Sequence, residues 1–85
     1  MTWRIVVDAS VHKTLHRIPR KDAERVEEAL DQLEDSPFSG DAHKMGGQEN
    51  TWRQRVGSYR LFYDIFIFEK TVLVFNLKRR GSKTY

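Results

Sequence analysis

Cysteine is absent from the sequence, and its absence excludes two classes of protein. A chain without thiols forms no disulfide and holds no metal through thiolates, so it is neither a disulfide-stapled secreted module nor a zinc–cysteine domain. The first residues also lack the charged region and long apolar stretch of a signal peptide. The longest apolar run, residues 61–68, contains Asp64 and is too short to span a bilayer. We therefore expect a cytoplasmic protein with no membrane partner.

The chain is also short, and its 85 residues lie near the size at which a single hydrophobic core becomes marginal. We expect one domain over residues 1–85, without a deep pocket for a bulky cofactor. The sequence contains no internal repeat, no phosphate-binding glycine loop, no serine or cysteine nucleophile motif and no paired-carboxylate site. We accordingly expect no small-molecule cofactor.

The charges are segregated along the chain, although the net charge is only +3. Residues 21–50 carry 3 basic and 9 acidic side chains, whereas residues 51–85 carry 8 basic and 2 acidic ones. Such segregation creates a local positive field that the net charge hides. The C-terminal half is either an ordinary solvated surface or the site of an anionic partner, for which nucleic acid is the leading candidate.

The N-terminal half predicts a strand followed by two helices. Residues 3–7 are β-branched and aromatic, which is typical of a strand. A helix capped by Asp8 or Ser10 follows and is interrupted by Pro19. Residues 21–34 show an apolar stripe on an otherwise acidic helix, whose charged face is either solvated or a partner site.

The C-terminal half predicts a loop over residues 36–50 and then three strands. The strands cover residues 51–56, 59–68 and 71–77, and they are separated by short turns. The fold class is therefore α+β: an N-terminal strand, a helical hairpin and an antiparallel three-strand meander form one sheet, with one face on the helices and one face open. The expected core face of the middle strand consists of Tyr59, Leu61, Tyr63, Ile65 and Ile67.

Three arginines should meet on the open face. Because side chains alternate along a strand, Arg53 and Arg55 share one face, and the turn at residues 57–58 brings Arg60 beside them. Gln54 then falls on the core face. Guanidinium groups that converge repel each other unless an anion lies between them, and their planar donors match phosphate. Alternatively, these arginines pair with the acidic helix or protect a sheet edge from aggregation.

Other side chains give weaker signals. Phe62, Phe66 and Phe68 should lie on the Arg60 side, where they either stack on bases or pack under another segment. His12 and His16 lie four residues apart on the first helix, but no zinc motif accompanies them, so we expect no metal site. His43 falls in the loop with no partner that the sequence identifies.

The segment from Trp52 to Tyr63, Trp-Arg-Gln-Arg-Val-Gly-Ser-Tyr-Arg-Leu-Phe-Tyr, resembles the hallmark of the RelE/ParE toxin superfamily. The initial strand, the helical hairpin that ends in Ser36-Pro37, the approach over residues 44–47 and the basic tail ending at Tyr85 extend the resemblance over nearly the whole chain. The resemblance implies a RelE-like, barnase-like microbial ribonuclease topology. It also implies a toxin of a type II toxin–antitoxin system in the RelE-like messenger-RNA interferase branch.

In that branch the ribose 2′-oxygen attacks the adjacent phosphate without a metal, and the messenger RNA is cut in the ribosomal A site. The resemblance assigns the catalytic positions to Arg53, Arg55, Arg60, Arg79 and Tyr85. It assigns further RNA contacts to Lys44, Lys78, Arg80 and Lys83. An arginine does not lose its proton in proteins, so Arg53 and Arg55 suit phosphate binding better than proton removal. Tyr85 is then the base, or the group that orients the nucleotide.

Two other functions share these residues. ParE-like members act on DNA gyrase, and a non-catalytic RNA-binding or ribosome-binding module would use the same basic face without a competent base. In each toxin reading the expected protein partner is a cognate antitoxin, whose acidic or amphipathic segment neutralises the basic surface.

Overall fold

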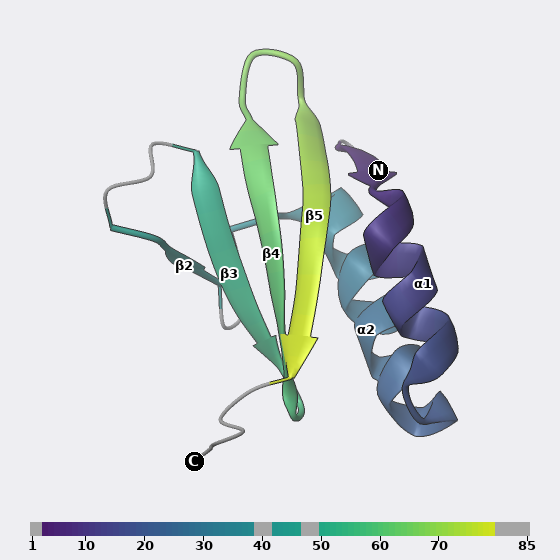
Figure 1. Cartoon of the computed structure of the whole chain (residues 1–85). Coiled ribbons are helices and arrows are strands. Elements are labelled where there is room, and N and C mark those ends of the chain that lie inside the picture. The colour runs from purple at the N-terminus through teal and green to yellow at the C-terminus, as the bar shows by residue number, and fades with distance from the viewer. Residues whose placement is uncertain (1–2, 39–41, 47–49, 80–85) are drawn as a thin grey trace.

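The computed structural model describes residues 3–38, 42–46 and 50–79, and it shows two helices packed on one face of a mixed sheet (Figure 1). This α+β architecture confirms the predicted fold class. The elements in chain order are β1 (Arg4–Val7), α1 (Ala9–Arg17), α2 (Arg20–Asp35), β2 (Ala42–Lys44), β3 (Thr51–Val56), β4 (Tyr59–Phe66) and β5 (Thr71–Arg79). Among the described residues, no helix has the length and apolar character needed to cross a membrane.

The five strands lie in the order β1-β5-β4-β3-β2. Strand β1 pairs parallel to β5, and β3, β4 and β5 form the predicted antiparallel meander. Strand β2 corrects the sequence-based prediction, which has only a loop over residues 36–50. It is three residues long and mostly exposed, and it pairs antiparallel with β3 at the sheet edge. Such a short, exposed strand leaves no alternating apolar pattern in the sequence.

Both helices begin and end close to the predicted residues. Asp8 caps α1, where its carboxylate accepts hydrogen bonds from the Ser10 amide at 3.0 Å and the Ser10 hydroxyl at 2.6 Å. These two bonds lower the pKa of the Asp8 carboxyl below its usual value. Pro19 separates the helices, and α2 starts directly after it at Arg20.

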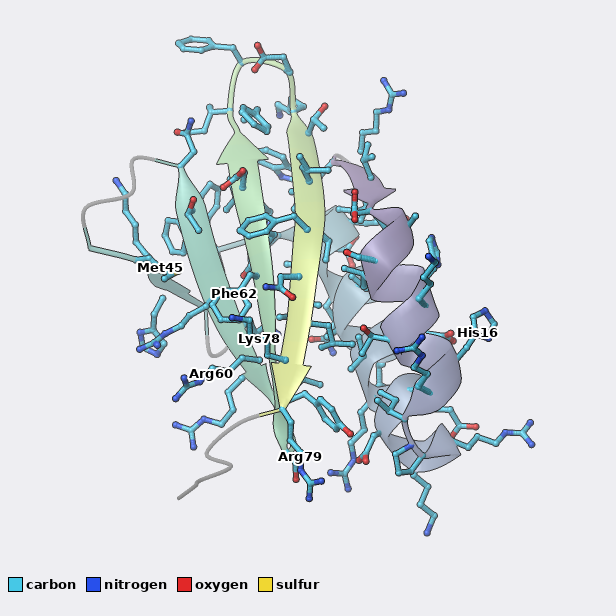
Figure 2. All side chains as sticks on the ribbon, in the orientation of Figure 1. His16, Met45, Arg60, Phe62, Lys78 and Arg79 are labelled. Atoms are coloured by element: carbon cyan, nitrogen blue, oxygen red, sulfur yellow. The ribbon has the colours of Figure 1, made fainter. Side chains whose placement is uncertain are left out.

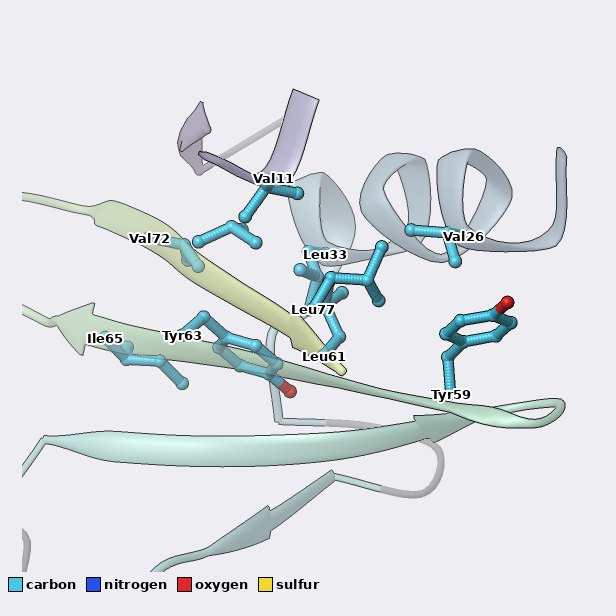
Figure 3. Close-up of a cluster of buried hydrophobic side chains, with 10 residues drawn as sticks. Val11, Val26, Leu33, Tyr59, Leu61, Tyr63, Ile65, Val72 and Leu77 are labelled. Atoms are coloured by element: carbon cyan, nitrogen blue, oxygen red, sulfur yellow. The ribbon is translucent and has the colours of Figure 1, made fainter. Parts of the chain in front are cut away.

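The core lies between the helix pair and one face of the sheet. Val11, Val26 and Leu33 from the helices are buried against β4 and β5 (Figure 3). The buried strand residues are Tyr59, Leu61, Tyr63, Ile65, Val72, Val74 and Leu77.

The placement of Ile67 in the core is wrong. Strand β4 ends at Phe66, and residues 67–70 form the turn to β5. The Lys70 amide donates to the Ile67 carbonyl at 3.1 Å, and Lys70 takes a positive φ of 51°. Ile67 is therefore 61% exposed, and Phe68 at the tip is 99% exposed rather than part of the open face.

Candidate nucleic-acid interface

A row of three cations crosses the open face of the sheet. Strand register places Arg55 directly opposite Arg60, and Arg60 directly opposite Lys78. Residues opposite one another share a face, with Cβ atoms about 5 Å apart. The side chains of Arg60 and Lys78 extend from the sheet on the side away from the helices (Figure 2). We call Arg55, Arg60 and Lys78 the cationic row.

A second row runs beside the cationic row, one step along the strands. Register aligns Arg53 with His43 on one side and with Phe62 on the other, and Phe62 with Asn76. Arg53 is two residues from Arg55 and therefore lies on the same face. The structure thus brings together the three arginines that the sequence places on one face. It adds His43, which the sequence leaves in a loop.

A β-bulge places Lys78 in this arrangement. Register shifts between Phe62 and Tyr63, so that Tyr63 pairs with Val74, Phe62 pairs with Asn76, and Phe75 is the extra residue on β5. Without the bulge, strict alternation would turn Lys78 to the same face as Val74, toward the helices. The sequence signal of this bulge is polar Asn76, which stands where alternation from Val72 and Val74 would place an apolar residue, while Leu77 is buried instead.

The positive charge of the face is not neutralised by the acidic helix. Among the described residues the side-chain ion pair is Arg20–Glu24 at 3.5 Å, within α2. Helix α2 lies on the opposite side of the sheet, so its carboxylates are separated from the cationic row by the core. The described part of the open face has one carboxylate, Asp64, which accepts a hydrogen bond from the Thr51 hydroxyl at 2.6 Å. Pairing with the acidic helix therefore does not explain the arginines.

Aromatic rings border the two rows. Phe62 and Phe75 are half-buried, with ring centroids 6.4 Å apart, and the Lys78 Nζ lies 6.0 Å from the centroid of the Phe62 ring. Phe66 is also half-buried on this face, as the sequence predicts. Phe62 therefore contacts both the Phe75 ring and, through a cation–π contact, the Lys78 ammonium group.

Two cations assigned by the resemblance lie apart from the rows. Arg79 is opposite the buried Tyr59, so it belongs to the helix side at the end of β5 (Figure 2). Lys44 is opposite Trp52 and likewise projects from the other face of β2. Arg80, Lys83 and Tyr85 lie outside the described residues.

Tyr63 and Gln54, both within the hallmark segment, serve the core. The Tyr63 hydroxyl donates to the Pro37 carbonyl and to Gln54 Oε1, each at 3.3 Å. These contacts explain why an amide occupies a core position of β3. Burial raises the pKa of Tyr63 to about 12, so its phenol stays protonated and takes no part in proton transfer near neutral pH.

Residues 5–83 match the family described as the ParE toxin of the type II toxin–antitoxin system parDE. The chain belongs to this toxin family. The toxin has no match among curated proteins. It is 31% identical to the chain matched in the archaeal RelE–RelB complex from Pyrococcus horikoshii OT3, with a TM-score of 0.87 over 98% of this chain and 100% of that chain.

More distant solved structures share the fold of the toxin. The RelBE2 toxin–antitoxin complex from Mycobacterium tuberculosis matches with 22% identity and a TM-score of 0.81, over 94% of this chain and 100% of that chain. The intact Escherichia coli RelBE complex matches with 20% identity and a TM-score of 0.78, over 94% of this chain and 99% of that chain. The toxin therefore has the RelE/ParE fold.

The open face of the toxin presents donors that are suited to phosphate binding. Among the described residues no three histidine, aspartate or glutamate side chains gather to hold a metal ion, and His12 and His16 are exposed on α1. Arginine and lysine donors lie side by side across β3, β4 and β5 on this face. That arrangement can bind a phosphodiester and stabilise additional negative charge on its oxygens.

Proposed function

We propose that this toxin is a ribosome-dependent, metal-independent endoribonuclease that cleaves messenger RNA in the ribosomal A site. The observation that carries the proposal is the pairing of Arg55 with Arg60 on the open face, extended by Lys78 and flanked by Arg53. Like charges directly opposite one another destabilise a sheet. A bound phosphate removes that cost and uses the arginine donors in pairs.

The arrangement supports cleavage by the 2′-oxygen of the RNA itself. This oxygen bonds to the adjacent phosphorus while the bond to the 5′-oxygen breaks, and negative charge grows on the phosphate oxygens. Arg53, Arg55 and Arg60 stabilise that charge, and Lys78 binds the adjacent part of the RNA backbone. The products are a cyclic phosphate and a 5′-hydroxyl, and no metal or cofactor enters the reaction.

In this proposal the remaining assigned residues contribute to RNA binding or to proton transfer. Arg79, Arg80 and Lys83 add positive charge for the RNA backbone, and Lys44 contacts RNA from the edge strand. Tyr85 acts as the base or orients the nucleotide. The family resemblance supports these roles.

We propose that a cognate antitoxin neutralises the toxin in the cytoplasm. Several solved relatives are toxin–antitoxin complexes, including the RelE–RelB complex from Pyrococcus horikoshii, which shares 31% identity with this chain. The open face can bind an acidic segment of the antitoxin, since four cations there have no ion pair with another described residue. Loss of growth inhibition when the antitoxin is co-expressed is the expected result.

A second candidate is inhibition of DNA gyrase, because the matching family is described as the ParE toxin. The two candidates separate in parallel assays with the same folded protein. The proposal predicts that translation on purified ribosomes stops with cleavage of the messenger, while gyrase supercoils DNA normally. Inhibited supercoiling with an intact messenger would overturn the ribonuclease proposal in favour of the gyrase function.

A further inference from the structure

We infer that His43 is the general base that takes the proton of the attacking 2′-hydroxyl, an inference that rests on the ribonuclease function proposed above. The reaction needs a group that can accept a proton near neutral pH. The arginines around the phosphate position do not lose their protons in proteins. Histidine is the side chain whose ordinary pKa, about 6.5, lets a neutral ring accept a proton at that pH.

The register of β2 carries this inference. Antiparallel pairing places His43 directly opposite Arg53, and alternation turns its neighbour Lys44 to the other face. Directly opposite side chains have Cβ atoms about 5 Å apart, and diagonal neighbours lie about 7–8 Å apart. His43 therefore lies beside Arg53 and diagonal to Arg55, within reach of the ribose of a nucleotide whose phosphate those two arginines hold.

The ring of His43 is available for this role. His43 is exposed, and no other described side chain bonds to it or pairs with it. Strand β3 is the element packed against β2, and its charged groups on the His43 side are Arg53 directly opposite and Arg55 on the diagonal. Both are positive, so no carboxylate of β3 forms an ion pair with the His43 ring.

A ring nitrogen of His43 takes the proton of the 2′-hydroxyl as the 2′-oxygen bonds to phosphorus. The bond between phosphorus and the 5′-oxygen breaks, and water supplies the proton to the departing oxygen. The histidine then returns its proton to solvent. Tyr85 keeps the orienting role in this scheme.

The test compares His43→Gln with His16→Gln in single-turnover cleavage of messenger RNA on ribosomes across pH 6 to 8.5. His16 is the matched control because it is an exposed histidine on α1, away from the open face (Figure 2). We expect His43→Gln to slow cleavage by about 100-fold or more, which is the usual contribution of a general base. We also expect it to abolish the increase of the rate with pH that a histidine base produces, while His16→Gln leaves both the rate and its pH dependence unchanged.

Binding of a 2′-O-methyl RNA, which has no attacking hydroxyl, separates chemistry from affinity. The inference predicts that His43→Gln binds this RNA as the unaltered protein does, with an unchanged melting temperature. Cleavage by His43→Gln at the unaltered rate would overturn the inference, and so would equal losses of binding and cleavage. A cleavage rate that continues to rise above pH 8, as a tyrosine base would produce, would also overturn it. If the unaltered toxin cuts no RNA, the proposed function fails first, and this inference fails with it.

Discussion

Removal of one cation from the open face should change the salt dependence of RNA binding by a calculable amount. Each cation that neutralises a phosphate of single-stranded RNA contributes about −0.7 to the slope of log K against log salt. Arg53, Arg55, Arg60 and Lys78 together contribute about −2.8, and Arg60→Ala reduces this share to about −2.1. Between 50 and 200 mM salt, the four cations weaken binding about 50-fold and the remaining three about 18-fold.

Fluorescence anisotropy with a labelled 2′-O-methyl RNA measures this slope, since the probe is not cut. Other cations, including those of the tail, contribute equally to both proteins, so the difference between the slopes is the decisive quantity. Arg17→Ala is the matched control, because Arg17 is an exposed arginine in the last turn of α1, on the opposite side of the sheet. An unchanged slope for Arg60→Ala, or an equal change for Arg17→Ala, would refute the assignment of the RNA to the open face.

Three further predictions concern stability. Tyr63→Phe removes the hydroxyl that donates to buried Gln54 and should destabilise the fold by about 1–3 kcal/mol, whereas an unchanged urea midpoint would contradict this assignment. Burial raises the pKa of Tyr63 from 10.0 to about 12, so the contribution of its protonated phenol to stability is complete below pH 10 and falls by up to roughly 3 kcal/mol as the pH rises to 12. Unfolding curves of Tyr63→Phe at alkaline pH should lack this decline. Gly57→Ala places a Cβ in the β3–β4 turn at a φ of +59° and 3.1 Å from the movable Nη1 of Arg25, so thermal unfolding should show a loss of about 1 kcal/mol, with a smaller loss for Gly57→Asn.

The elements with a clear period were predictable from the sequence. The apolar stripe of α2 and the alternation along β4 each identify a buried face, and both faces meet in the core. The shared face of Arg53, Arg55 and Arg60 followed from alternation and one tight turn. These features depend on local geometry, which the sequence encodes directly.

The features that were missed depend on pairing between distant segments. Strand β2 exists because three residues, two of them exposed, add to the edge of β3, and their own composition predicts a loop. His43 was therefore not recognised as a neighbour of Arg53. The bulge at Phe75 decides whether Lys78 or Arg79 shares a face with Arg60, and strand alternation alone cannot place it.

End-mapping on programmed ribosomes shows whether Arg53, Arg55 and Arg60 hold the phosphate at which messenger RNA is cut. A ribosome with a defined codon in its A site is incubated with the toxin, with the Arg55→Ala/Arg60→Ala variant, and with Arg17→Ala. We expect a cut within that codon, with a cyclic phosphate and a 5′-hydroxyl, by the toxin and by Arg17→Ala but not by the double variant. Equal cutting by a correctly folded double variant, or an intact messenger with every protein, would contradict it.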